Sequence, residues 1–290
     1  MGKHSGGVTD YQGVDASMIK PEQVRPPFAY FGGKTTLAPR IAELLPEHDH
    51  YVEPFAGGLS VLLAKQPSRA ETVNDLDGDL VNFWKVLRDQ PEELERAAML
   101  TPHSRAEYDA SKSLDGDDLE RARRVWVRLT QGRSNSMQPH GWRYGRDISK
   151  VMATHIKAHA SRMAPAASRL ANVSIENRDA LDLIRDYGSD PNVCIYADPP
   201  YLGSTRGTNY RIEMLEDDLH VQLADALLEC KASVVLSGYA SLLYEDLYPG
   251  WHRMELKAPT ALSARAAESE VLWSNVALGA QQAFDFGGAA

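Results

Sequence analysis

An apolar run ends abruptly before residue 198, and this point organises the rest of the chain. Residues 193–197 are rich in branched and aromatic side chains, which predicts a buried strand. Asp198, Pro199, Pro200 and Tyr201 follow, and the two prolines cannot continue the ladder of a sheet. We therefore expect a carboxylate, two prolyl carbonyls and an aromatic ring at the C-terminal end of a central strand, where open α/β sheets bind ligands.

Two earlier apolar segments are also predicted to be strands that end at acids. The first ends at Glu53, and a turn containing Gly57 and Gly58 leads from it into an apolar helix. The second ends at Asp75, about 20 residues after the glycine turn, where Rossmann-like folds place a carboxylate on a ribose. The alternative for this acidic segment is a helix N-cap before residues 80–87. A nicotinamide site is disfavoured because the glycine turn is not G-x-G-x-x-G.

A second glycine turn lies near the N-terminus, in residues 26–39. The sequence Gly33-Lys34-Thr35 invites comparison with a phosphate-binding P-loop, but Phe28 occupies the position of the first required glycine. Another interpretation is a turn into a helix over 37–45, with an anion or carboxylate held by backbone N–H groups and Lys34. A purely structural glycine turn is the alternative.

Strands and helices alternate through most of the chain, which predicts an α/β sheet covered by helices on both faces. The later elements are a helix over 218–230, a strand over 232–236, and a closing strand pair over 252–256 and 271–278. Residues 1–24 lack periodicity and are expected to form a mobile arm.

The overall charge argues against bulk electrostatic binding of nucleic acid. The 290 residues carry a formal net charge of −9. Basic residues nevertheless concentrate in one window that contains a predicted helix over 115–128 and a glycine-rich loop over 130–146. Its arginines are Arg121, Arg123, Arg124, Arg128, Arg133, Arg143 and Arg146. Arginines beside Trp142 and Tyr144 could contact nucleic acid through phosphates, base edges and stacking, and the alternative is a solvated helix followed by a surface loop.

The two cysteines and the start of the chain bear on location. Cys194 and Cys230 form no metal pattern and are interpreted as free thiols in a reducing cytoplasm. No apolar run is long enough for a membrane span, and the first ten residues show no signal peptide. We therefore expect neither a metal site nor a membrane partner.

The group at 198–201 favours chemistry on an amino group. A carboxylate and a fixed prolyl carbonyl can accept the two hydrogens of an exocyclic amine, and a tyrosine ring can stack on its base. Ordinary turn chemistry at a strand end is the alternative.

Six segments together resemble the Dam-like, or D12 class, N6-adenine-specific DNA methyltransferases. The matching segments are residues 28–34, 51–58, 74–75, 198–201, 236–239 and 270–275. The resemblance implies a Rossmann-like S-adenosylmethionine-dependent methyltransferase fold with an inserted, mainly helical target-recognition subdomain. It places the first part of the catalytic domain at 25–85, the insertion at 86–171, the second part at 172–280 and a tail at 281–290.

The resemblance also implies roles for individual residues. Tyr30 and Lys34 are expected to flank S-adenosylmethionine, Asp75 to bind its ribose, and Asp179 either to contact its adenine or to cap a helix. The loop under the methionine moiety would contain Glu53, Pro54, Phe55, Gly57 and Gly58. Asp198, Pro199, Pro200 and Tyr201 would form the catalytic group, with Asp198 also beside the cofactor. The residues expected to contact DNA are Arg128, Arg133, Asn135, Arg143, Tyr144 and Arg146.

The implied activity is methyl transfer from S-adenosylmethionine to N6 of a flipped adenine in double-stranded DNA. The alternatives are cytosine-N4 or RNA-adenine methylation, a protein glutamine substrate, an inactive DNA-binding relative, and a nucleotide hydrolase, which the failed P-loop spacing weakens. A cytoplasmic enzyme of a bacterium or phage fits this activity, and a restriction endonuclease is the partner it implies. A monomer would suit an asymmetric base-flipping site.

Overall fold

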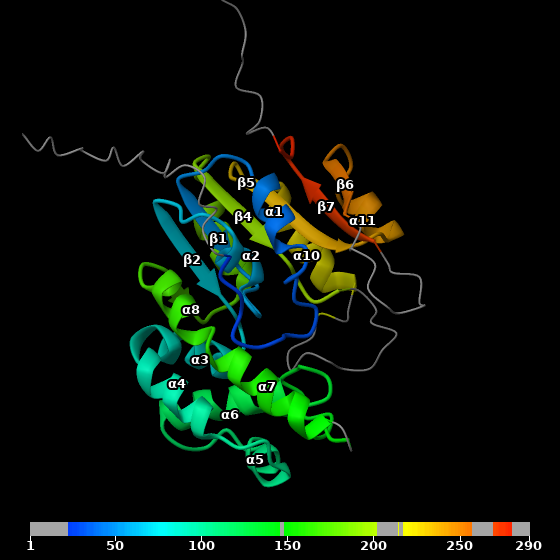
Figure 1. The fold of residues 1–290 in the computed structure, drawn as a ribbon. Helices are drawn as coiled ribbons and strands as arrows, with labels where there is room; N and C mark the ends of the chain where they lie inside the picture. Colours follow the sequence, from blue (N-terminus) through cyan, green and yellow to red (C-terminus); the bar gives the residue numbers. More distant parts are fainter. Residues whose placement is uncertain (1–22, 146–147, 202–213, 215–216, 257–268, 280–290) are drawn as a thin grey trace, which may run out of the picture.

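A single mixed sheet forms the centre of the structure, a computed structural model that describes residues 23–145, 148–201, 214, 217–256 and 269–279. Within these residues seven strands pair in the order β3-β2-β1-β4-β5-β7-β6. The strands are β1 (His50–Glu53), β2 (Ala70–Asn74), β3 (Ser174–Glu176), β4 (Val193–Ala197), β5 (Ser233–Tyr239), β6 (His252–Leu256) and β7 (Glu270–Ser274). Figure 1 shows the sheet above a group of helices.

The strand order places a topological switch point between β1 and β4. The strands from β3 to β5 are parallel, and β7 runs antiparallel to both β5 and β6. From β1 the chain moves outward through β2 to β3, and from β4 it moves the other way to β5. A crevice therefore opens at the carboxyl ends of β1 and β4, which is the general ligand position in doubly wound sheets.

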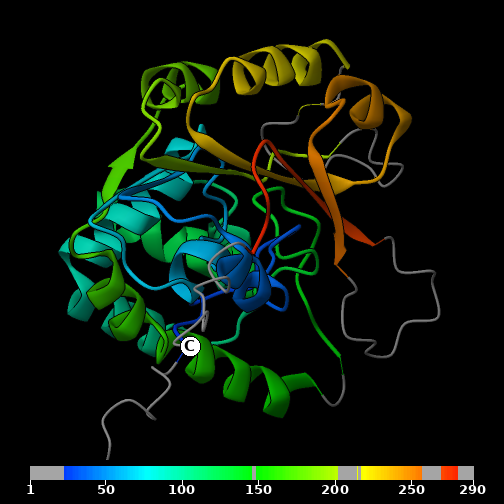
Figure 2. The same ribbon diagram turned by 90° about the horizontal axis from the view of Figure 1, so that it is seen from above.

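Helices cover both faces of the sheet, as the alternating pattern predicted. Seen from above, α9, α10 and α11 lie on one side of the sheet, while α1 and α2 lie on the opposite side (Figure 2). The described helices are α1 (Ala38–Leu44), α2 (Ser60–Ala64), α3 (Gly78–Asp89), α4 (Pro91–Leu100), α5 (Arg105–Ala110), α6 (Asp118–Gln131), α7 (Ile148–Ala160), α8 (Met163–Leu170), α9 (Ala180–Gly188), α10 (Asp217–Leu228) and α11 (Leu242–Leu247). Among them none combines the length and hydrophobicity needed to cross a lipid bilayer.

Alternating side chains of the central strands enter two separate cores. In β4, Cys194 and Tyr196 face the core shared with α1, α2 and α3, whereas Val193, Ile195 and Ala197 face the core shared with α9 and α10. All five side chains are buried. The uninterrupted apolar run of β4 therefore reflects burial on both faces, as expected for a central parallel strand.

The closing strand pair is shorter than the sequence predicted. β7 ends at Ser274 rather than at residue 278. The side chain of Asn275 accepts a hydrogen bond from the backbone N–H of Val234 at 2.8 Å and donates one to the carbonyl of Ala232 at 2.9 Å. The side-chain amide of Asn275 thus takes the place of main-chain hydrogen bonds to the start of β5, and β7 ends one residue before it, at Ser274.

Helices α3 to α8 gather at the end of the sheet drawn at the bottom of Figure 1. The predicted boundary at residue 86 falls inside α3, which starts just after β2 and packs along α6. Because α3 spans the predicted boundary between the catalytic domain and the insertion, it connects the helical group directly to the sheet.

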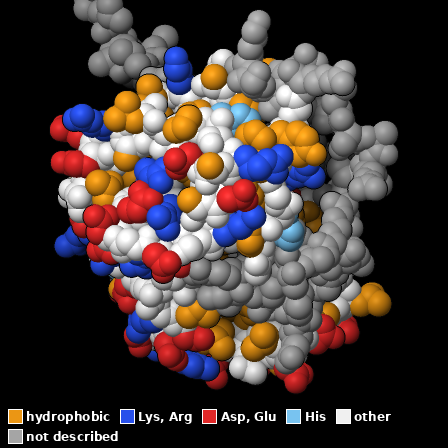
Figure 3. All heavy atoms as spheres, turned by 90° about the horizontal axis from the view of Figure 1, so that it is seen from below, with side chains coloured by type: hydrophobic (Ala, Val, Ile, Leu, Met, Phe, Trp, Pro, Cys, Tyr) orange, Lys and Arg blue, Asp and Glu red, His pale blue; other side chains and the backbone are white. Residues whose placement is uncertain are grey.

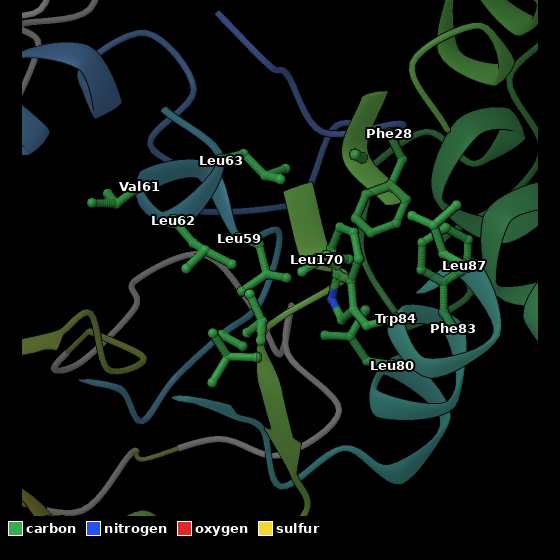
Figure 4. Close-up of a cluster of buried hydrophobic side chains, with 14 of the residues drawn as sticks. Phe28, Leu59, Val61, Leu62, Leu63, Leu80, Phe83, Trp84, Leu87 and Leu170 are labelled. Carbon is green, nitrogen blue, oxygen red and sulfur yellow. The ribbon is translucent and has the colours of Figure 1, made fainter. Parts of the chain in front are cut away.

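Aromatic side chains of this helical group hold the two glycine turns. Phe28 packs against Phe83 and Trp84 of α3, with ring centroids 5.0 and 5.2 Å apart (Figure 4). Trp84 Nε1 donates to the carbonyl of Gly57 at 3.0 Å, and Trp126 Nε1 donates to the carbonyl of Pro27 at 3.0 Å. The helical group thus fixes the backbone of the loops that border the crevice.

Candidate active site

Four acidic residues meet at the carboxyl ends of four parallel strands. Glu53 is the last residue of β1, Asp75 follows β2, Asp179 follows β3 and Asp198 follows β4. All four line one cavity of about 240 Å³. The cavity lies at the switch point of the sheet, so the topology brings together acids that are far apart in sequence.

The cavity gathers every residue predicted to contact the cofactor. These residues are Tyr30, Lys34, Glu53, Pro54, Phe55, Gly57, Gly58, Asp75, Asp179 and Asp198. Pro200 also lines the cavity, whereas Pro199 and Tyr201 are not among the described lining residues. Sequence analysis gave no role to several other lining residues, including Leu76, Leu181, Tyr196 and Met214, which lack a distinguishing motif.

The glycine loop is shaped by close contact with Tyr30. Gly57 adopts a φ of +46°, and a Cβ there would lie 3.2 Å from a ring carbon of Tyr30. A Cβ at Gly58 would lie 3.0 Å from the Cβ of Tyr30. The backbone N–H of Gly57 donates to Asp75 Oδ2 at 2.9 Å. Two glycines therefore let the ring, the loop and the carboxylate approach one another.

The sequence left open whether the acids around Asp75 face a ligand site or cap the following helix, and the structure assigns these positions to different residues. Asp77 caps α3 by accepting from the N–H groups of Asp79 and Leu80 at 3.0 and 3.3 Å. Asp75 Oδ1 accepts from the N–H of Asp77 at 2.9 Å, and its carboxylate lines the cavity. The helix cap is thus Asp77 rather than Asp75.

Asp179 caps a helix at the edge of the cavity. Its Oδ1 accepts from the N–H groups of Leu181 and Asp182 at 2.8 and 3.4 Å, which caps α9. The same residue lines the cavity. Because α9 begins beside the crevice, the carboxylate that caps this helix also lies at the crevice.

The turn at Lys34 holds a carboxylate of the protein itself. Lys34 Nζ lies 2.8 and 2.9 Å from the two oxygens of Asp198 and donates to the carbonyl of Gly32 at 3.0 Å. The N–H of Gly33 donates to the carbonyl of Tyr30 at 3.0 Å and closes the turn. Because only 6% of the lysine side chain is exposed, this ion pair is shielded from solvent and fixes the orientation of the carboxylate.

A second buried carboxylate lies next to Asp198 and was missed by sequence analysis. Glu270 opens β7, and its Oε1 accepts from the hydroxyls of Tyr201 and Ser237 at 2.5 and 3.0 Å. The same hydroxyls lie 3.2 and 3.0 Å from Asp198 Oδ1. The signal in the sequence was a polar residue beside an apolar run, at Ser237 after residues 234–236 and at Glu270 before residues 271–273.

Glu53 lies in an environment that favours its neutral form. Burial raises the pKa of Glu53 to about 8, and the nearby Asp198 carboxylate adds to this rise. The hydroxyl of Tyr51 donates to Glu53 Oε2 at 2.9 Å and opposes the shift. A positive group placed in the cavity would therefore change the protonation of this side chain.

The predicted basic face is largely neutralised by acidic neighbours. Arg121 pairs with Asp79 at 2.6 Å, Arg123 with Glu120 at 2.7 Å, and Arg124 with that same glutamate at 2.7 Å. Figure 3 shows acidic and basic side chains interspersed on the side that carries the helical group. The arginines of α6 therefore stabilise its surroundings, and the window is not a continuous basic surface.

Arg128 was predicted to contact DNA, but the structure places it in the interior. Only 4% of the residue is exposed. Its guanidinium donates to the carbonyl of Ser111 and to that of Met137, the latter at 2.9 Å. The side chain holds the loop after α6 in place, and this interior position does not suit a phosphate or base contact.

The remaining described candidates lie in a hairpin closed by the bridge between Gly132 and Trp142. Asn135 Oδ1 accepts from the Arg143 guanidinium at 2.7 Å, and the guanidinium of Arg133 lies 5.0 Å from the ring of Tyr144. Arg146 lies outside the described residues.

An arginine outside the predicted window joins this hairpin. Arg105, at the start of α5, lies 4.8 Å from the ring of Trp142 and 5.1 Å from that of Tyr144. The two rings stack with centroids 5.8 Å apart, and His103 stacks on Trp142 at 4.7 Å. Tyr144 remains 55% exposed, so this cationic and aromatic stack reaches the surface.

The described residues contain no group of three or more His, Cys, Asp or Glu side chains that could hold a metal ion. The acids around the cavity are instead paired with Lys34, with hydroxyls and with backbone N–H groups. These partners leave an oxygen-rich cavity suited to cationic and hydroxyl-bearing ligands.

Comparisons with known proteins agree with this architecture. The family model described as "D12 class N6 adenine-specific DNA methyltransferase" matches residues 30–262. The Type II methyltransferase M1.LlaDCHI of Lactococcus lactis subsp. cremoris is 26% identical over 272 residues, covering 84% of this chain and 91% of that protein.

Solved structures give a weaker likeness. Two structures of the rRNA methyltransferase aviRa from Streptomyces viridochromogenes cover 92% of this chain and 94% of theirs, with 13% and 14% identity and TM-scores of 0.40 and 0.35. The strand order described above carries the fold assignment, which is that of a Rossmann-like methyltransferase. From the family match over most of its length, the chain belongs to the D12 class of N6 adenine-specific DNA methyltransferases, enzymes that use a methyl donor to methylate adenine at specific sites in DNA.

Proposed function

We propose that the cavity binds S-adenosylmethionine as the methyl donor. The observation that carries this proposal is the set of four carboxylates around one cavity at the switch point. Glu53 would face the cationic methionine end, and Asp75 would accept from the ribose hydroxyls. The N–H groups of Gly57 and Asp77 already hold the Asp75 carboxylate at the cavity. When bound, the cofactor supplies an electrophilic methyl group on a sulfonium.

We further propose that Asp198 and the carbonyl of Pro199 hold the target amine. An adenine rotated out of the helix would present N6 at the strand end, where these two acceptors take its hydrogens. This arrangement directs the nitrogen lone pair toward the methyl group through orientation and electrostatics. Lys34 holds the Asp198 carboxylate in a fixed orientation through contacts to both of its oxygens, and Pro200 and the ring of Tyr201 would position the base.

For DNA contact, we propose the stack formed by Arg105, Arg133, Trp142 and Tyr144, with Asn135 and Arg143 beside it. Arginine can bind phosphates or base edges, and exposed aromatic rings can stack on or wedge between bases. The carbonyl of Asn135 accepts from the N–H of Phe31 at 2.8 Å, so the hairpin is tied to the turn that borders the cavity. DNA bound at the hairpin would therefore lie close to the methyl-transfer site.

The biological setting follows from the activity. We propose that the enzyme acts as a monomer in the cytoplasm of a bacterium or a phage-infected cell, where Cys194 and Cys230 stay as thiols. A restriction endonuclease that cuts the same sequence is the partner that the methylation would block.

Incubation with labelled S-adenosylmethionine and mixed-sequence double-stranded DNA tests the proposal. Nucleoside mass spectrometry should find N6-methyladenine, and sequencing the modified positions should reveal one recognition site. Labelled cofactor should also bind in the absence of DNA. N4-methylcytosine, or retention of cofactor with no methylated base in DNA or RNA, would contradict the proposed chemistry.

Replacing Arg105 or Arg133 with alanine should weaken DNA binding without changing cofactor affinity. Each change removes a surface cation, so we expect a loss of about three- to tenfold and a salt slope reduced by about one. Fluorescence anisotropy with labelled duplex at several salt concentrations measures both quantities. Arg124→Ala is the matched control, because this arginine is engaged by Glu120. Equal losses in all three variants would contradict a specific role for the stack.

A further inference from the structure

Asp198 and Glu270 share two hydroxyl protons. Tyr201 and Ser237 each lie within hydrogen-bond distance of both carboxylates, with O···O separations from 2.5 to 3.2 Å. A hydroxyl has one proton and can donate to only one acceptor at a time. The two hydroxyls therefore form two parallel bridges along which a proton can pass between the carboxylates.

Lys34 lies closer to one of the two carboxylates than to the other. Lys34 Nζ lies 2.8 Å from Asp198 but 3.8 Å from Glu270. Burial raises the pKa of Glu270, Lys34 lowers it and Asp198 raises it again. The charged and titratable groups that face Glu270 are Lys34, Tyr196, Asp198 and Tyr201, with the Ser237 hydroxyl among them. Two carboxylates with one close ammonium form a site that can hold one additional proton.

Methylation of an amine creates a proton that must leave. N6 begins with two hydrogens, and after it gains a methyl group the adenine carries a positive charge until one N–H bond breaks. Asp198 is placed to take that hydrogen, but a proton on its carboxylate would disrupt the ion pair with Lys34, whose Nζ lies 2.8 and 2.9 Å from the two oxygens. A proton on Asp198 is therefore expected to move onward.

We propose that Glu270 is the acceptor of this proton and acts through Asp198. The N6–H bond breaks and an O–H bond forms on Asp198 Oδ1. Asp198 then gives this hydrogen to the oxygen of Ser237 or Tyr201 as that hydroxyl transfers its own hydrogen to Glu270 Oε1. No electrons are exchanged, and the net change is one proton moved from N6 to Glu270. The proposal rests on the assignment of Asp198 to N6 made above.

Glu270→Gln tests this role because the amide keeps the size and one acceptor oxygen but cannot take up the proton. We expect the single-turnover rate of methyl transfer to fall about 10²-fold, while the Kd for S-adenosylmethionine stays unchanged. In the wild type this rate should increase as the pH rises above the ordinary titration range of a glutamate and Glu270 ionises, and the variant should lose this increase. Glu270→Asp should restore it in part.

The two bridging hydroxyls provide an independent test. Ser237→Ala and Tyr201→Phe should each slow the reaction less than Glu270→Gln, because one bridge remains. The double variant should reproduce the loss of the pH-dependent increase, and it carries the test if Glu270→Gln does not fold.

Two results would overturn the inference. One is a wild-type rate in Glu270→Gln, and the other is a slow variant that keeps the wild-type pH profile, which would indicate a structural role alone. A failure of the proposed function would look different, since Asp198→Asn would then retain activity or the wild type would form no N6-methyladenine.

Discussion

Replacing Asp198 with asparagine is expected to lower methyl transfer to DNA by at least about 10³-fold. The amide has nearly the same shape, but it loses the ionised oxygen that would accept an N6 hydrogen. Its NH₂ group would also face Lys34 or the substrate amine, and both of these are donors. We expect the Kd for S-adenosylmethionine to change by less than about tenfold, because Glu53 and Asp75 remain.

Single-turnover assays with saturating DNA and cofactor measure the effect on Asp198→Asn directly. Asp89→Asn is the matched control, since this aspartate lies at the end of α3 and pairs with Arg88 at the surface. The control should keep the wild-type rate. A variant that transfers methyl groups at the wild-type rate, with a normal melting temperature, would remove Asp198 from the mechanism.

Much of the cavity was predictable because its residues sit where regular elements end. Apolar runs that stop at Glu53, Asp75 and Asp198 mark strand ends, and parallel strands bring their carboxyl ends to one edge. Gly57 and Gly58 marked a loop that approaches its neighbours closely. Local sequence thus indicated both the positions and their shared location, and the resemblance to one family supplied the roles.

Pairing between distant elements was not predictable in the same way. Counting arginines in one window could not reveal that Arg128 is buried under the loop or that Arg121 pairs with Asp79 from α3. Arg105 joins the exposed stack although it lies outside the window. Glu270 reaches Asp198 only because β7 turns back along β5. These features depend on tertiary contacts that no single segment specifies.

The raised pKa of Glu53 should make stability and cofactor binding depend on pH. In the folded chain its pKa is about 8, above the ordinary value of 4.5 expected after unfolding. The folded state therefore holds an extra proton between these values, and the contribution of Glu53 to stability falls as pH rises from 4.5 to about 8. Melting temperatures measured across this pH range without cofactor should show the fall in the wild type, and Glu53→Gln should lack the part of it that comes from Glu53.

Binding of S-adenosylmethionine should release a proton from Glu53 below about pH 8. The positive methionine end would favour the ionised carboxylate, so affinity should rise with pH by up to about tenfold per unit and level off above the pKa of the free protein. Calorimetry in two buffers of different ionisation enthalpy, at the same pH, measures the released proton. Glu53→Gln should bind more weakly and release none, whereas Glu43→Gln, an exposed change on α1, should behave as the wild type. Proton release that persists in Glu53→Gln would place the titrating group elsewhere.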